Sequence, residues 1–141
     1  MPITLEEIPG LNATHQSCWQ VRALAIDGKS PALAALDAWA SSSSDDYKKI
    51  LKVLRMVGQF DRIHDETKVT KSADPDHGDV YEIRAHKGHA RLFFFYSKSD
   101  ESVIVCTNSF WKGKGSQSAA FALCAKLKAL FLRAQHESQS R

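Results

Sequence analysis

The segment EIRAHKGHARLFFFY, residues 82–96, holds the side chains of this chain that are best suited to act on a phosphate group. It contains two arginines, two histidines and a lysine: Arg84, His86, Lys87, His89 and Arg91. Arginine binds phosphate through parallel N–H donors, and histidine is the side chain that most often transfers protons near neutral pH. The dipeptide Lys87-Gly88 can form a hairpin turn. The segment therefore predicts a basic β-hairpin, which is either a solvated surface or an anion site.

The position of the turn determines which residues of this hairpin share a face. Three pairs then lie opposite one another on one face: His86 with His89, Arg84 with Arg91, and Glu82 with Phe93. The other face is apolar and is expected to meet the helices: Tyr81, Ile83, Ala85, Ala90, Leu92 and Phe94. Opposed arginines repel, so a bound phosphate, or the Glu82 carboxylate diagonal to Arg91, is expected between them. Phe93 either stacks on a nucleic-acid base at this face or packs beneath a neighbouring segment.

A second candidate anion site lies in the segment WKGKGS, residues 111–116. Lys112 and Lys114 flank a glycine-rich turn, and Ser116 is a good N-cap for a helix that follows. The free N–H groups of a helix N-terminus attract anions. The pattern GxxxxGK[ST] is absent from the chain, which argues against nucleotide hydrolysis. A flexible, soluble turn remains the alternative interpretation of this segment.

Several other classes of protein are disfavoured by the composition. The three cysteines show no CxxC spacing, which argues against a disulfide framework and a zinc site. His86 and His89 lack the further ligands that a metal ion needs, so we expect neither a metal nor a cofactor. The start of the chain has no secretory pattern and no apolar run is long enough to span a membrane, so we expect a cytoplasmic protein. The net charge is +3, and basic residues are in excess after residue 80, which favours an anionic partner such as nucleic acid.

Hydrophobic periodicity and turn signals divide the 141 residues into an arm, one domain and a tail. We expect an N-terminal arm over 1–17, a domain over 18–132 and a flexible tail over 133–141. Within the domain the patterns predict strands at 18–26, 80–86, 89–96 and 102–110, and helices at 31–40, 45–58 and 117–132. The predicted order is β-α-α-β-β-β-α. This order is typical of an α+β domain with a mostly antiparallel, twisted sheet and helices packed on one face.

The segment DVYEIRAHKGHARLFFFYSKSDESVIVCTNSFWKGKG, residues 79–115, resembles the core of the RelE/ParE toxin superfamily, and most closely its HigB-like, phage-derived branch. Arg84 matches the arginine of the family's E-L-R motif and Arg91 that of its y-R-v motif. Phe110 and Lys112 match the F-K-K motif, in which Trp111 replaces the first lysine. The upstream strand and two-helix hairpin also match, so the resemblance covers residues 18–131. It implies a RelE-like fold.

The resemblance further implies the toxin of a type II toxin–antitoxin system, which cleaves mRNA on the ribosome and is silenced by a cognate antitoxin protein. Arg84 and Arg91 would stabilise the charge on the phosphate, Lys112 or Lys114 would hold a neighbouring phosphate, and His86 or His89 would transfer protons. Further contacts to RNA are expected from Lys68 and Lys71 in the long connection 61–79, and from Lys87 and Phe93. Two alternatives remain: an inactive RNA- or protein-binding module of the same fold, and a ParE-like toxin directed at gyrase. The resemblance leaves the oligomeric state undetermined.

Overall fold

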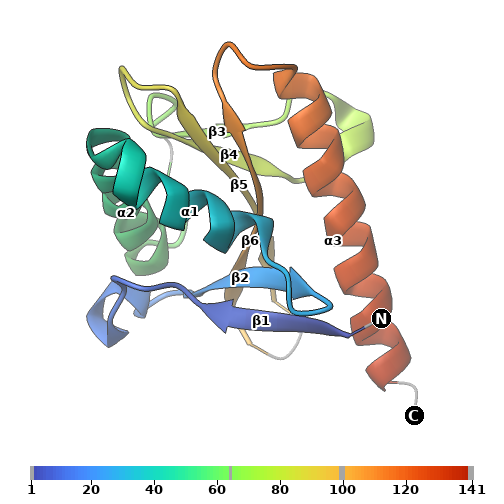
Figure 1. The fold of residues 1–141 in the computed structure, drawn as a ribbon. Helices are drawn as coiled ribbons and strands as arrows, with labels where there is room; N and C mark the ends of the chain where they lie inside the picture. Colours follow the sequence, from blue (N-terminus) through green and yellow to red (C-terminus); the bar gives the residue numbers. More distant parts are fainter. Residues whose placement is uncertain (1, 64, 99–100, 140–141) are drawn as a thin grey trace.

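A six-stranded mixed sheet and three α-helices form an α+β fold in the computed structural model, which describes residues 2–63, 65–98 and 101–139 (Figure 1). The strands are β1 (Ile3–Glu7), β2 (Gln20–Ile26), β3 (Val69–Lys71), β4 (Tyr81–Arg84), β5 (Ala90–Ser97) and β6 (Val103–Trp111). The helices are α1 (Pro31–Ser42), α2 (Ser44–Gln59) and α3 (Gln117–Gln139), with short 3-10 turns at Ala13–Gln16 and Pro75–His77. The strand order across the sheet is β1-β2-β6-β5-β4-β3, so β4, β5 and β6 are adjacent as well as consecutive.

The predicted register of the β4–β5 hairpin is confirmed. Arg84 pairs with Arg91, and Glu82 pairs with Phe93. The pairing of His86 with His89 is not part of this ladder, because β4 ends at Arg84 and β5 begins at Ala90. Four of the five strand pairs are antiparallel, as expected, and only β2 and β6 run parallel.

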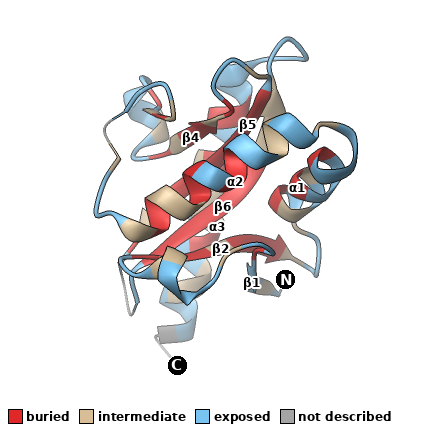
Figure 2. Cartoon of the chain, turned by 90° about the vertical axis from the view of Figure 1, so that its left-hand side faces the viewer, coloured by how far each residue is buried: buried red, intermediate tan, exposed pale blue. Residues whose placement is uncertain are grey.

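Helices α1 and α2 lie on one face of the sheet and cross at a steep angle, because α1 runs across the view in Figure 1 and is seen nearly end-on in Figure 2, where α2 runs lengthwise. Ser30 caps α1 by accepting a hydrogen bond from the Leu33 N–H at 3.2 Å, and Pro31 follows at the first helical position, as the sequence predicts. The apolar side of α2 buries Ile50, Leu54 and Val57. These side chains pack against the apolar face of the β4–β5 hairpin, so the predicted contact of that face with helices is confirmed.

Helix α3 packs on the opposite face, so the prediction that all helices lie on one face is wrong (Figure 1). The buried side of α3 includes Phe121 and Phe131, whose rings meet Phe93 and Phe95 of β5 with centroids 5.0 and 5.5 Å apart. Both faces of the sheet are therefore covered, and the central strands are buried (Figure 2). Ser116 caps this helix as predicted, accepting a hydrogen bond from the Ala119 N–H at 3.1 Å.

An irregularity in the β5–β6 pairing changes the side-chain alternation of β6. The register shifts between Leu92 and Phe94. Val103 and Val105 face α3 before the shift, and Phe110 belongs to the same cluster after it, although simple alternation would put it on the other face. The strand thereby keeps an apolar residue under the start of α3.

Three segments differ from the prediction. The N-terminal segment, expected to form an arm outside the domain, contains the edge strand β1, which pairs with β2 and leads into the buried Ile8. Residues 69–71, expected to be loop, form the opposite edge strand β3. Helix α3 runs to Gln139, beyond its expected end at 132 and through most of the expected tail. No helix in the described part of the chain is long and apolar enough to cross a membrane.

Candidate functional site

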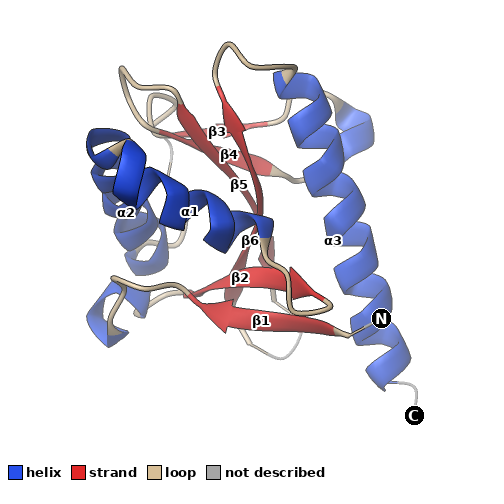
Figure 3. Cartoon of the chain, viewed as in Figure 1, coloured by secondary structure: helices blue, strands red, loops and turns tan. Residues whose placement is uncertain are grey.

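The β4–β5 turn and the β6–α3 loop lie at the same end of the sheet (Figure 3). Together with residues 66–67 before β3 they enclose a surface depression of about 740 Å³. We call it the hairpin depression. Six of the residues predicted to form the site line it: Arg84, His86, Lys87, His89, Arg91 and Lys112. The two anion sites predicted separately, on the hairpin and on the following loop, are therefore parts of one basic depression.

Arg84 is held by a carboxylate on its own strand. Its Nε donates to Glu82 Oε1 at 2.9 Å, and the Glu82 side chain is fully buried. Gln117, at the start of α3, donates to the other oxygen, Oε2, at 2.8 Å. The sequence prediction placed Glu82 diagonal to Arg91, but the hydrogen bond forms with Arg84. Among the described residues Glu82 engages the Nε atom, and the side chain of Arg84 is 36% exposed, so the end of the guanidinium group is accessible to an anion.

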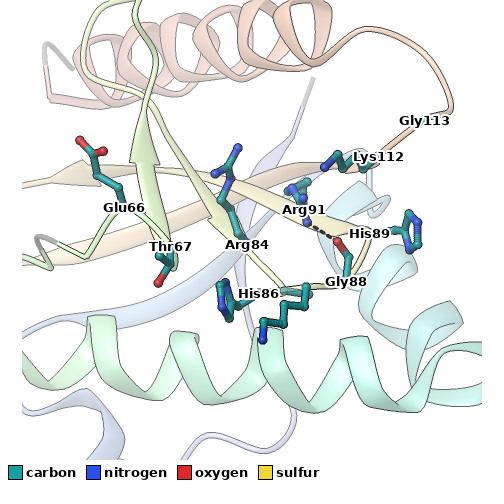
Figure 4. Close-up of a pocket in the computed structure, with 11 residues that line it drawn as sticks. Glu66, Thr67, Arg84, His86, Gly88, His89, Arg91, Lys112 and Gly113 are labelled. Atoms are coloured by element: carbon teal, nitrogen blue, oxygen red, sulfur yellow. Dashed lines mark hydrogen bonds between the residues drawn. The ribbon is translucent and has the colours of Figure 1, made fainter.

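Arg91 is almost completely buried and donates to backbone carbonyls. Its Nη1 lies 3.1 Å from the Gly88 oxygen (Figure 4) and 2.9 Å from the Ala90 oxygen. Burial lowers the pKa of Arg91 from its ordinary value, an effect that the negative charges of Glu82 and Asp46 oppose and the positive charge of Arg84 reinforces. Arginine side chains in proteins keep their positive charge at neutral pH. Within the described part of the chain no carboxylate forms an ion pair with Arg91, and a buried cation of this kind favours a bound anion.

The turn that carries the two histidines has a defined backbone. The Gly88 N–H donates to the Ala85 oxygen at 2.7 Å, and Lys87 adopts a left-handed conformation with φ of 63°. The His89 ring stacks on Trp111, with centroids 5.3 Å apart, and its imidazole points away from the two arginines (Figure 4). His86 lies on the Arg84 side of the turn. The tryptophan that replaces a lysine of the F-K-K motif thus holds one of the two histidines.

Four of the predicted contacts to RNA do not line the depression. Lys68 pairs with Asp65 at 2.6 Å, and Lys71 pairs with Asp79 at 2.8 Å. Phe93 is fully buried against Phe121, so the prediction that it can stack on a base is wrong. The remaining residue is Lys114, which is exposed and lies in the turn after Trp111. These positions were assigned from charge and type alone, without the partners that the tertiary structure provides.

Sequence reasoning missed Glu66 and Thr67, which line the depression opposite the hairpin turn (Figure 4). They precede β3, a strand of three residues that is too short for a periodic signal. The backbone N–H of Arg84 donates to the Lys68 oxygen at 2.8 Å, and this bond fixes the segment beside the hairpin. Glu66 adds a carboxylate to an otherwise basic rim.

One other group of polar side chains lies outside the hairpin depression, in the connection between β3 and β4. Ser72 Oγ lies 2.7 Å from His77 Nδ1, and His77 Nε2 lies 3.5 Å from Asp74, an arrangement with the residue types of a hydrolytic triad. The three residues come from one short connection, and the His77 ring stacks on Phe121 of α3, so they brace this connection against the helix. Within residues 2–63, 65–98 and 101–139, no group of three or more histidine, cysteine, aspartate or glutamate side chains is placed to hold a metal ion.

Comparison with known proteins identifies the family. The model of the phage-derived protein Gp49-like family (DUF891) matches residues 37–122, more than half of the chain. The chain belongs to the Gp49-like family. Members of this family are toxin-like proteins of the RelE and HigB type. No curated protein and no solved structure shows a significant match.

The family match covers every residue that lines the hairpin depression of this Gp49-like protein. It includes residues 66–67, the whole β4–β5 hairpin, the loop after β6 and the first turn of α3. It begins within α1 and leaves out β1 and β2, so these two strands lie outside the part that the family model describes. The depression therefore lies in the part of the fold that the family shares.

Proposed function

We propose that this chain is the toxin of a type II toxin–antitoxin system and that it cleaves mRNA on the ribosome with its own side chains as catalysts. The observation that carries this proposal is the convergence on the hairpin depression of Arg84 from β4, Arg91 from β5 and Lys112 from the loop that follows β6. Membership of a toxin-like family supports the toxin role. The expected partners are translating mRNA in the cytoplasm and an antitoxin protein that silences the activity.

The reaction places negative charge where the cations lie. The 2′-oxygen of a ribose attacks the adjacent phosphorus while the bond to the 5′-oxygen of the next nucleotide breaks, which leaves a 2′,3′-cyclic phosphate and a 5′-hydroxyl. Charge accumulates on the non-bridging phosphate oxygens as the new bond forms. Arg84, held by Glu82, and Arg91, held by two carbonyls, present donors whose orientation is set before the substrate binds. One preorganised donor of this kind contributes about 3–4 kcal/mol to stabilising a transition state.

Lys112 extends the cationic surface beyond the arginines. It is exposed at the end of β6, and its backbone N–H donates to the His89 oxygen at 2.9 Å. That bond ties the β6–α3 loop to the hairpin turn. We assign Lys112 to a phosphate adjacent to the one that reacts. A lysine ammonium group on its flexible side chain makes a single charge contact, whereas an arginine guanidinium group binds a phosphate through two N–H donors in a fixed geometry.

The reaction also moves two protons: one leaves the 2′-hydroxyl and one must reach the 5′-oxygen. We assign proton transfer to His86 in preference to His89, because the His89 ring stacks on Trp111 and points away from the arginines (Figure 4). The carboxylate of Glu66 is the second acid–base group on the rim of the depression. A histidine and a carboxylate on one rim provide one group for each proton transfer.

Expression in bacterial cells and cleavage of mRNA by purified protein with translating ribosomes test this proposal. We expect wild-type protein to arrest growth and to yield fragments that end in a 2′,3′-cyclic phosphate. The double variant Arg84→Ala/Lys112→Ala should lose both effects while its circular dichroism spectrum stays unchanged. Arg133→Ala removes an exposed positive charge near the far end of α3 and should behave as wild type. Equal arrest by the wild type and the double variant would contradict the assignment.

Other outcomes of the same experiment identify the two alternatives. Wild-type protein that binds RNA in a salt-sensitive manner without cleavage or arrest is a binding module of the same fold. Growth arrest with a DNA-damage response and intact mRNA is the mark of a gyrase-directed toxin. Either outcome removes the nuclease proposal.

A further inference from the structure

We propose that Asp46 and Lys49, on the first turns of α2, form a clamp that sets the shape of the β4–β5 turn and thereby positions Arg91 for a phosphate. This inference rests on the proposed function for the nature of the substrate. Neither residue lines the hairpin depression, and both act through the backbone of the turn. They are therefore positioning residues.

The carboxylate of Asp46 binds two consecutive N–H groups of the turn. Its Oδ2 accepts from the His89 N–H at 2.7 Å and from the Ala90 N–H at 2.8 Å. Hydrogen bonds from backbone N–H groups to a carboxylate are short and strong compared with neutral ones. The contact joins residues more than 40 positions apart in the chain, so it connects α2 to the hairpin through a tertiary contact.

Gly88 is the residue that lets Asp46 approach so closely. A Cβ atom at position 88 would lie 2.6 Å from Asp46 Oδ1 and 2.8 Å from Oδ2, much closer than side-chain atoms pack. The glycine is needed here for space, because its φ is not in the left-handed region. A glycine in the turn and an aspartate on α2 are therefore both needed for this close contact.

Lys49 holds the other side of the same turn. Its Nζ donates to the His86 oxygen at 2.9 Å, and it lies three residues after Asp46, on the same side of α2. Between these two contacts lies Lys87, with its left-handed φ of 63°. A non-glycine residue persists in that conformation where the surrounding contacts require it, and such positions cluster at functional sites.

The clamp determines where the Gly88 carbonyl points, and this carbonyl is one of the two acceptors of Arg91 Nη1 (Figure 4). If the turn relaxes, Arg91 loses an acceptor that fixes its guanidinium group at the edge of the depression. The negative charge of Asp46 also opposes the effect of burial on the Arg91 cation. Displacement of a reacting or stabilising group by about 1 Å can slow a reaction by about 100-fold.

Titration with inorganic phosphate, followed by the Nε–H resonance of Arg91, measures this positioning without any need for cleavage. We expect Asp46→Ala to weaken phosphate binding by about tenfold or more. The same variant should accelerate hydrogen exchange at the His89 and Ala90 amides. Asp46→Asn keeps an oxygen acceptor but loses the negative charge, and its phosphate binding should fall between that of wild type and that of Asp46→Ala. Asp45→Ala is the matched control, because it removes the same charge from the same helix turn at an exposed position.

A second pair of variants keeps the test decisive if Asp46→Ala does not fold. Lys49→Met should weaken phosphate binding, whereas Lys48→Met, at the exposed neighbouring position, should not. Phosphate binding of wild-type strength in both Asp46→Ala and Lys49→Met overturns the clamp, as does a wild-type protein that binds no phosphate. Phosphate binding with the expected variant effects but without RNA cleavage supports the clamp and removes only the proposed nuclease activity.

Discussion

Arg84 and Arg91 lie directly opposite each other in the β4–β5 pair, yet their guanidinium groups are held by different kinds of acceptor. Arg84 donates to the buried Glu82 carboxylate, whereas Arg91 donates to two backbone carbonyls. Among the described residues, only Arg84 of the two forms an ion pair. The Glu82 carboxylate thus offsets the charge of Arg84 and reduces the repulsion expected between the two neighbouring cations. The charge of Arg91 is left to attract an anion.

Replacement of Glu82 should destabilise the protein and release Arg84. Glu82→Ala removes a buried acceptor that binds Arg84 and Gln117, so we expect the free energy of unfolding to fall by about 3 kcal/mol. Gln117→Ala removes one hydrogen bond at an exposed residue and should cost about 1 kcal/mol. Urea denaturation measures both losses. A Glu82→Ala variant as stable as Gln117→Ala would show that the carboxylate contributes little beyond its bond to α3.

The lysines of the long connection should matter less for RNA cleavage than Lys112. Lys68 and Lys71 are paired with aspartates and lie outside the depression, so Lys68→Ala and Lys71→Ala should retain cleavage within about twofold. Lys112→Ala should lower the rate by about 10- to 100-fold, because it removes a donor that lines the depression. Single-turnover cleavage assays compare the three variants. A loss in Lys71→Ala as large as that in Lys112→Ala would extend the RNA path across β3.

The packing of α3 on the sheet should account for much of the stability. Phe121 meets Phe93 edge to face at 5.0 Å and is 7% exposed, so Phe121→Ala should cost about 3–5 kcal/mol of unfolding free energy. Leu123, two positions along the helix, is 43% exposed, and Leu123→Ala should change stability by about 0.5 kcal/mol or less. Thermal or chemical unfolding distinguishes the two. Similar losses at both positions would contradict the placement of α3.

The three cysteines should differ in their reactivity toward a thiol reagent. Cys18 is exposed, whereas Cys106 and Cys124 are buried, and burial raises the pKa of Cys124 to about 11 and that of Cys106 further still. At pH 8.5 a maleimide should therefore label Cys18 and leave the other two unmodified until the protein unfolds. Mass spectrometry of peptides from native and urea-treated protein checks this. Labelling of Cys124 in the native protein would show that the α3 face opens on the timescale of the reaction.

The raised thiol pKa values also give a direction for the dependence of stability on pH. The folded protein keeps these thiols protonated at a pH where the unfolded chain has lost the protons. The contribution of the thiols to the free energy of unfolding is therefore complete below about pH 8.5. It decreases as the pH rises from there towards about 11 at Cys124. Cys124→Ala should flatten this part of the stability profile relative to wild type.

Local pattern was sufficient to predict the hairpin and its register. Alternation of side chains and one turn position placed Arg84 opposite Arg91 and assigned the apolar face to the helices, and both features are confirmed. The capping residues Ser30 and Ser116 were also identified, because a cap depends on neighbours within a few positions. Each of these features is determined by interactions over a short stretch of chain.

The remaining features of the fold and the site depend on contacts between segments that are far apart in the chain. Helix α3 covers the face that carries Phe93, for which alternation alone left both packing and base stacking possible. The position of a helix on a sheet depends on the whole connection and not on its own periodicity. The short strand β3 brings Glu66 beside the arginines, although three residues provide too little pattern to predict a strand. Sequence by itself determined which cations share a hairpin face. Only the tertiary structure decided how the acceptors of these cations are positioned, because Gln117, which donates to Glu82, and Asp46, which accepts from the hairpin turn, come from helices far from the hairpin in the chain.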